Sequence, residues 1–245
     1  MGQLFVHGED IRFNTRAKVF PDGSVMGLVS DRAIFRAPGW VDAREHQREK
    51  PAPKRATKPE DSLARARRRA RAAVFDLARA NDLRWFVTFT CDPRKIDRED
   101  DAAVLKAWRV WMQNAVQRRG LRYVAVAEYH KNPRALHFHA LCMADWREGD
   151  LAASGKVDKA GRPIYNLDAW PYGFTTAVRV TGDYDAVCGY LAKYITKAEV
   201  KPAGRWYYQG GKLARPAVRC ANTEYDDYPG EGYKIPSLGV KIKRF

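Results

Sequence analysis

The chain has 245 residues, of which 45% are hydrophobic, so it can bury a core and is not globally disordered. Lysine and arginine number 44 against 29 aspartate and glutamate residues, which gives a formal net charge of +15 at pH 7. Such a charge favours a polyanionic partner, most often nucleic acid, with an anionic membrane surface as the second option. No apolar run approaches the roughly 18 residues that a membrane-spanning helix needs, so a spanning protein is excluded.

The first residues show no basic segment followed by an apolar stretch, so we expect no secretory signal. The four cysteines lie far apart, at Cys91, Cys142, Cys188 and Cys220. This spacing argues against a zinc knuckle and a disulfide framework, and it favours reduced thiols in a cytoplasm. A Walker A phosphate-binding loop is also missing, so the chain is not expected to carry a nucleotide-driven motor.

The two ends of the chain differ in composition from its middle. Residues 1–42 predict an accessory segment of short strands, with a hairpin turning at Pro21-Asp22-Gly23. Residues 43–60 are charged and proline-containing, which is typical of a solvated linker. Residues 217–245 are interpreted as a basic tail.

Residues 62–80 carry apolar side chains at helical spacing and predict a helix. Its first half holds a run of arginines without an acid. Such a run is most often a solvated helix face, but in a chain of charge +15 we interpret it as a surface that contacts phosphates. The arginines assigned to DNA binding are Arg65, Arg67, Arg68 and Arg69.

Strands and helices then alternate in a recognisable order. Aromatic and β-branched residues predict a buried strand over 85–91, and apolar side chains every three or four residues predict a helix over 99–119. The remaining predicted elements are strands 123–130, 135–143 and 174–180, a looser segment over 145–171, and a helix over 183–200. This order predicts an α+β fold with a mainly antiparallel sheet.

Three of the five histidines lie within ten residues, and two of them alternate along a strand. The period of two places His137 and His139 on one face, and a four-residue loop places Glu128 opposite His137. Two imidazoles and a carboxylate suit Mg²⁺ or Mn²⁺, although the ligand types do not exclude zinc. His130 is an alternative ligand. Two histidines that are merely hydrogen-bonded on a polar sheet surface are the structural alternative.

The last predicted helix repeats the pattern Tyr-x-x-Lys twice, four residues apart. Its two phenols and two ammonium groups share one arc of the helix beside the buried stripe: Tyr190, Lys193, Tyr194 and Lys197. A tyrosine can act as a covalent nucleophile, and a nearby lysine can support the phenolate or the phosphate charge. Ordinary packing is the alternative for a tyrosine pair at this spacing.

Several stretches together resemble the HUH endonuclease superfamily, in particular the two-tyrosine rolling-circle replication initiators of single-stranded DNA phages and related plasmids. They are FDLARANDLRW, FVTFTCDP, AEYHKNPRALHFHAL, YGFTTAVRV and YLAKYITK, in the family's order. The resemblance implies a nuclease domain over residues 61–216, with a central antiparallel sheet of about five strands and flanking helices (an RRM or ferredoxin-like arrangement).

The resemblance also implies roles for the residues. Glu128, His137 and His139 match the metal ligands, Tyr190 and Tyr194 match the alternating nucleophiles, and Lys193 and Lys197 match the lysines beside them. It further implies nicking and rejoining of single-stranded DNA at a replication origin through a 5′-phosphotyrosine intermediate.

Because the sequence has no Walker A motif, we expect no helicase domain in it. A host helicase and polymerase are therefore expected as partners, in the cytoplasm of a host cell that carries the phage or plasmid. The alternatives are a relaxase or transposase with the same chemistry, and a non-catalytic protein that binds single-stranded DNA or RNA.

Overall fold

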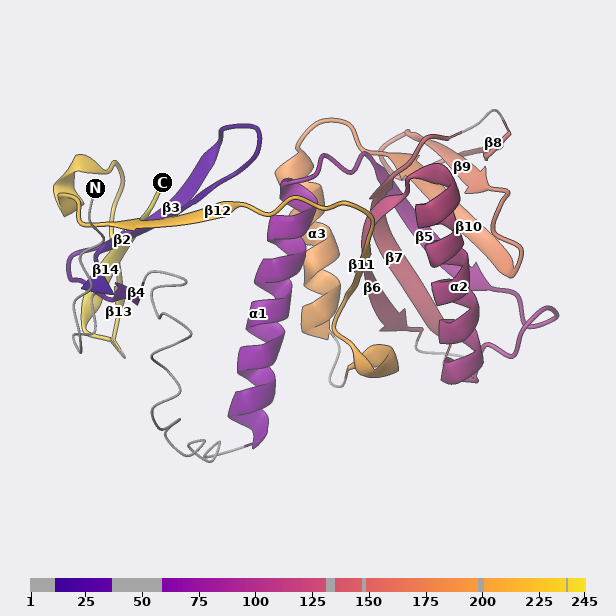
Figure 1. Cartoon of the computed structure of the whole chain (residues 1–245), viewed down its shortest axis with the longest axis horizontal. Coiled ribbons are helices and arrows are strands. Elements are labelled where there is room, and N and C mark those ends of the chain that lie inside the picture. Colours follow the sequence, from indigo (N-terminus) through magenta and orange to yellow (C-terminus); the bar gives the residue numbers. More distant parts are fainter. Residues whose placement is uncertain (1–11, 37–58, 131–134, 147–148, 198–200, 237) are drawn as a thin grey trace. The chain divides into compact units, whose positions relative to one another are not determined.

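The computed structural model describes residues 12–36, 59–130, 135–146, 149–197, 201–236 and 238–245 (Figure 1). The chain divides into two compact units, one made of residues 1–55 and 216–245 and the other of residues 56–215. No helix within the described ranges is long and apolar enough to cross a membrane.

The described residues of the unit 56–215 form three α-helices and a seven-stranded sheet. Its elements are α1 (Pro59–Arg79), β5 (Trp85–Cys91), α2 (Asp101–Arg119), β6 (Arg122–Tyr129), β7 (Leu136–Met143), β8 (Leu151–Val157), β9 (Pro163–Leu167), β10 (Gly173–Arg179), α3 (Tyr184–Lys197), the short 3-10 helix η2 (Pro202–Gly204) and β11 (Tyr208–Gly210). The strand order is β11-β6-β7-β5-β10-β9-β8, and each neighbouring pair is antiparallel. The predicted α+β fold with an antiparallel sheet is therefore confirmed.

The sheet has seven strands instead of about five because two regions in which no strand was predicted also form strands of this sheet. The looser segment 145–171 contains the hairpin of β8 and β9, whose turn is stabilised by Asp158. The Asp158 side chain accepts hydrogen bonds from the backbone N–H groups of Ala160 and Arg162, both at 2.9 Å. The other added strand, β11, pairs with β6 at the opposite edge.

The helices cover both faces of this sheet, with α2 on one face and α1 beside α3 on the other (Figure 1). Under α2, the rings of Trp108 and Phe138 stack with centres 4.1 Å apart. Helix α2 begins two residues after the predicted start: the Asp100 side chain accepts hydrogen bonds from two backbone N–H groups there, and Gly120 ends the helix with φ 60°. A residue with a side chain would be strained at this φ.

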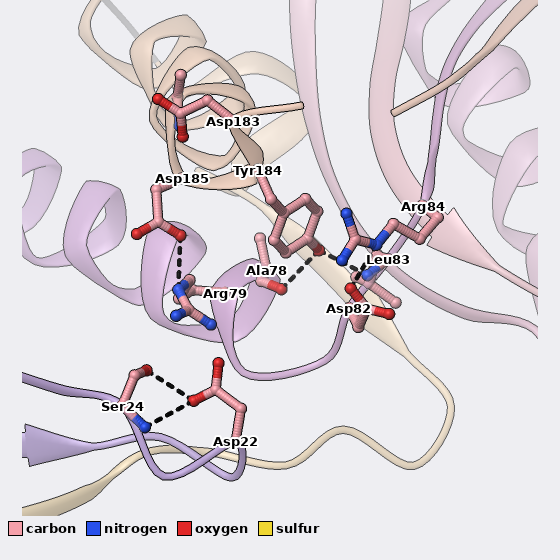
Figure 2. A network of polar contacts seen from close by, with 11 residues as sticks. Asp22, Ser24, Ala78, Arg79, Asp82, Leu83, Arg84, Asp183, Tyr184 and Asp185 are labelled. Carbon is pink, nitrogen blue, oxygen red and sulfur yellow. Dashed lines mark hydrogen bonds and ion pairs between the residues drawn. The ribbon is translucent and has the colours of Figure 1, made fainter. Parts of the chain in front are cut away.

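The other unit contains a five-stranded antiparallel sheet of order β12-β2-β3-β14-β13 and a separate two-stranded sheet of β1 and β4. Its elements are β1 (Arg12–Phe13), β2 (Thr15–Val19), β3 (Val25–Ser30), β4 (Phe35–Arg36), β12 (Ala217–Ala221), the 3-10 helix η3 (Tyr225–Asp227), β13 (Tyr233–Ile235) and β14 (Val240–Arg244). The predicted hairpin at Pro21-Asp22-Gly23 is confirmed by the pairing of β2 with β3. In its turn, the Ser24 backbone N–H and Oγ donate to the Asp22 carboxylate at 3.0 and 2.6 Å (Figure 2).

The interpretation of residues 217–245 as a basic tail is wrong, because β12 pairs with β2 and β14 pairs with β3. Val240 and Ile242 alternate with lysines in β14, and both are almost completely buried. Lys241 and Arg244 are exposed, whereas the Lys243 ammonium donates to the backbone carbonyls of Tyr225 and Tyr228 at 3.3 and 3.0 Å. The predicted linker 43–60 lies outside the described residues except for its last two positions, which begin α1.

Candidate functional site

The predicted metal ligands lie on the face of the sheet that α1 and α3 cover. The register places Glu128 of β6 directly opposite His137 of β7, as the four-residue loop predicted. On the other edge of β7, Thr90 of β5 pairs with His137, and Thr88 pairs with His139. The two histidines are therefore flanked by a carboxylate on one side and by two hydroxyls on the other.

Hydrogen-bonding contacts orient both imidazole rings. Thr88 Oγ1 lies 3.1 Å from His139 Nδ1, and Thr90 Oγ1 lies 3.3 Å from His137 Nδ1. On its opposite edge, His139 Nε2 lies 3.0 Å from the Glu128 carboxylate. Partners on Nδ1 that leave Nε2 for a ligand are typical of metal-binding histidines.

The two threonines were not predicted as site residues from the sequence. The pattern Thr-x-Thr in β5 has the same period of two as His-x-His in β7, which is a usable signal. It becomes informative only when β5 is known to pair with β7 in this register.

His137 is held in its neutral form. Burial, followed by the charges of His130 and His139, lowers the pKa of His137 to about 4. The ring of His130 stacks on that of His137 with centres 5.3 Å apart. A neutral imidazole at pH 7 is the form that can bind a metal ion.

The start of α3 is held against the turn between α1 and β5 by one phenol. The Tyr184 hydroxyl donates to the Ala78 carbonyl at 2.8 Å and accepts from the Leu83 backbone N–H at 2.5 Å (Figure 2). The Arg84 guanidinium lies over the Tyr184 ring, 4.7 Å from its centre, and pairs with Asp82. The position of α3 relative to β5 is therefore fixed by hydrogen bonds as well as by packing.

Two acidic residues complete this anchorage. The Asp183 carboxylate accepts a hydrogen bond from the Ala186 backbone N–H at 3.0 Å, which caps the helix start. Asp185 forms an ion pair with Arg79 of α1 at 2.5 Å (Figure 2). Negative charge at this end also matches the helix dipole.

The anchored helix brings its two repeat tyrosines to the histidine face. The ring of Tyr194 stacks on His139, with centres 4.0 Å apart and planes 16° apart. The hydroxyls of Tyr190 and Tyr194 lie 2.7 Å apart and share a hydrogen bond. An unbroken chain of contacts thus runs from Glu128 through His139 and Tyr194 to Tyr190.

The two phenols are not equivalent, although the helical repeat gave no reason to separate them. Tyr190 is 51% exposed and Tyr194 is 7% exposed. Burial, the hydrogen bond with Tyr190 and the nearby Glu128 charge raise the pKa of Tyr194 above its ordinary value. Of the accompanying lysines, Lys193 is exposed, and the side chain of Lys197 lies outside the description.

A groove of about 550 Å³ opens beside the tyrosines. Its walls come from α3, β5, β9 and β10, and they include Thr88, Tyr190, Tyr194 and Arg162. A space of this size beside an exposed phenol can hold a nucleotide-sized group.

The arginines of α1 lie on the same side of the sheet. Arg65, Arg68 and Arg69 are exposed, whereas Arg67 is half-buried. Helices α1 and α3 run antiparallel beside each other (Figure 1), and the Ala78 contact with Tyr184 aligns their ends. Since Arg69 and Arg65 precede Ala78 by 9 and 13 residues, the arginine run lies level with the last turn of α3, next to Tyr194.

Glu128 and His139 present two donor atoms whose spacing can be compared with that of ligands on a divalent cation. Among the described residues, no three His, Cys, Asp or Glu side chains form a group that could hold a metal ion as they stand. The 3.0 Å separation of Glu128 Oε2 and His139 Nε2 nevertheless matches two adjacent ligands of an octahedral ion, which are about 3 Å apart when each bond is about 2.1 Å. The described residues thus provide one pair of donor atoms at a spacing that a divalent cation accepts, with His137 paired in register opposite Glu128.

Part of the chain that contains this site is similar to a known family. Residues 84–199 match the family model of the replication-associated protein ORF2/G2P. The matched segment runs from the start of β5 to the end of α3, so it contains the histidines, Glu128 and both tyrosines but not the arginines of α1. The match supports a role in DNA replication. No curated protein and no solved structure matches the chain.

Proposed function

We propose that the protein is a rolling-circle replication initiator that nicks and rejoins single-stranded DNA at an origin. The observation that carries this proposal is the contact chain Glu128–His139–Tyr194–Tyr190, which joins candidate metal ligands to candidate nucleophiles. The replication-associated family match supports the biological setting. Ordinary core packing does not require a carboxylate, an imidazole and two phenols to contact one another in this order.

Glu128, His137 and His139 would hold a divalent cation, Mg²⁺ or Mn²⁺. When bound, such an ion polarises a phosphate oxygen and stabilises the charge of the transition state. Thr88 and Thr90 keep the imidazole rings oriented through their Nδ1 atoms. Arginines of α1 and Lys193 attract the DNA backbone by their charge.

Tyr190 is proposed as the phenol that attacks first, since its exposure lets a phosphate reach Oη. The Oη–P bond forms and the P–O3′ bond breaks, which leaves a 5′-phosphotyrosine and a free 3′ end. The phenol loses its proton as the bond forms, and the released 3′ oxygen gains one. Tyr194 Oη, 2.7 Å away, provides a hydrogen-bonding partner for the reacting oxygen.

Rejoining follows from the same chemistry. A phosphotyrosine is still a phosphodiester, so a 3′-hydroxyl can reverse the step without an external energy source. Tyr194 is proposed as the second nucleophile, which accepts a DNA strand while Tyr190 is occupied. Strand separation and synthesis would require a host helicase and polymerase, in the cytoplasm of the host cell.

The test is incubation with single-stranded oligonucleotides that tile the replicon encoding the chain, with Mn²⁺, scored for a covalent protein–DNA adduct. Wild-type protein is expected to form an adduct with at least one oligonucleotide, and chelation of the metal should abolish it. The Tyr190→Phe/Tyr194→Phe double variant should form none. Tyr172→Phe, which removes a phenol near Trp170 on the α2 side of the sheet, should behave as wild type.

Two outcomes would overturn the proposal. Adduct formation by the double variant would remove the tyrosines from the mechanism. Binding of every oligonucleotide without an adduct would assign the protein to non-catalytic single-strand binding.

A further inference from the structure

A second pocket, of about 490 Å³, lies on the α2 side of the sheet, beside the edge strand β11. It shares no lining residue with the groove at the tyrosines. Tyr123 and Tyr208, which line it, belong to the core cluster under α2, whereas Tyr194 belongs to the cluster on the other face. The proposed nicking reaction does not use this pocket.

One wall of the pocket is a stripe of α2. Arg109, Gln113 and Val116 are spaced by four and three residues, so they share one side of the helix. Arg109 and Gln113 are exposed, and the neighbouring Trp108 is fully buried. The stripe therefore lies at the margin of the core and presents a guanidinium and an amide to the pocket.

The facing wall comes from β11 and the segment before it. Arg205 and Gln209 are exposed there, and Tyr207 is half-buried. Gln209 pairs in register with Val124, so its side chain, to which Arg215 Nη2 donates at 3.4 Å, points to the α1/α3 face. None of the residues that line the pocket is acidic, so its charge favours an anion.

The pocket also contains aromatic rings. Tyr123, Tyr207 and Tyr208 line it together with the two arginines. Burial raises the pKa of Tyr123 to about 12, so its phenol is neutral and adds no negative charge at pH 7. Tyr207 packs against the core cluster of the other face, so the rings beside the arginines are those of Tyr123 and Tyr208, and both are buried.

We propose that this pocket binds a phosphate group of single-stranded DNA between the guanidinium groups of Arg109 and Arg205. The Gln113 amide, on the same side of α2 as Arg109, can donate a hydrogen bond to a phosphate oxygen. This second contact holds a part of the strand away from the reacting phosphate. It does not depend on nicking.

The test measures binding of a fluorescent single-stranded 12-mer of mixed sequence to the full chain in the presence of a metal chelator, where no nicking takes place. Arg109→Gln/Arg205→Gln should weaken binding about tenfold and lower the slope against log salt by about 1.4, at about 0.7 per lost phosphate contact. The matched control, Lys106→Gln/Arg118→Gln, removes the same charge from exposed positions of α2 outside the pocket and should change affinity less than threefold.

Equal losses of affinity in the pocket variant and in the control variant would overturn the proposal. Displacement of the 12-mer by micromolar dTMP would assign the pocket to a free nucleotide and would overturn its role in strand binding.

The covalent adduct assay, run separately with Mn²⁺, distinguishes this proposal from the proposed function. If the pocket variant binds DNA more weakly but the wild-type protein never forms an adduct, the pocket is supported and the nicking function is refuted. If the wild-type protein forms adducts but the pocket variant binds DNA as well as it does, the nicking function is supported and the pocket is refuted.

Discussion

The sharpest test of the histidine face is the substitution Thr88→Val. It replaces a hydroxyl by a methyl group of similar size and leaves a residue that is well suited to a strand. The lost atom is Oγ1, which lies 3.1 Å from His139 Nδ1. The perturbation therefore removes the orientation of one imidazole without opening a cavity.

The magnitude follows from the contact that is lost. A hydrogen bond contributes about 0.5–1.5 kcal/mol net, and loss of a group that orients a ligating histidine typically costs 10- to 100-fold in metal affinity or activity. A tenfold change in metal affinity corresponds to about 1.4 kcal/mol, which lies at the upper end of the range for one hydrogen bond. We therefore expect about a tenfold rise in the Mn²⁺ concentration needed for half-maximal adduct formation, with little change in thermal stability.

The assay is a Mn²⁺ titration of adduct formation on one cleavable oligonucleotide. Thr176→Val is the matched control, because Thr176 of β10 pairs in register with Thr88 and is exposed in the groove. It should leave the Mn²⁺ dependence unchanged. An equal Mn²⁺ requirement for wild type and Thr88→Val, or the same loss in both variants, would refute the assigned role of Thr88.

Three further predictions concern DNA binding and pH. The exposed arginines of α1 are Arg65, Arg68 and Arg69. Their replacement by glutamine should lower the slope of single-strand binding against log salt by roughly 2, at about 0.7 per phosphate contact. An unchanged slope would show that these arginines form a solvated helix face. Phe174, which is 58% exposed and pairs in register with Thr90, should stack on a base, so Phe174→Ala should weaken oligonucleotide binding by about 1–3 kcal/mol, as anisotropy would detect. The pKa of His137 is lowered from 6.5 to about 4, so its contribution to stability is complete above pH 6.5 and is lost as the pH falls toward 4. Between pH 7 and pH 4.5, the wild type should therefore lose more of its resistance to urea than the His137→Asn variant.

Local sequence patterns predicted most elements around the site. The apolar repeat of α2, its acidic start and its terminal Gly120 are properties of one continuous segment, and so is the alternation in β7. The pairing of Glu128 with His137 was also predictable, because a short hairpin loop determines the register of its two strands.

Contacts between distant segments were not predictable in this way. The neighbours of His137 and His139 on β5 depend on the strand order, and the pairing of β12 and β14 with the N-terminal hairpin joins residues about 200 positions apart. The helical repeat likewise placed both tyrosines on one arc. Their different burial depends on where α3 crosses the sheet, with Tyr194 over His139 and Tyr190 toward the groove.

The central claim is that the phenols of α3 become covalently attached to DNA. The most direct measurement is mass spectrometry of proteolytic peptides from the trapped adduct, for the wild type and each single phenylalanine variant. We expect the wild-type adduct on Tyr190, a slower adduct on Tyr194 in Tyr190→Phe, and a normal first nick with impaired repeated joining in Tyr194→Phe. DNA attached to a residue outside α3 would contradict the account.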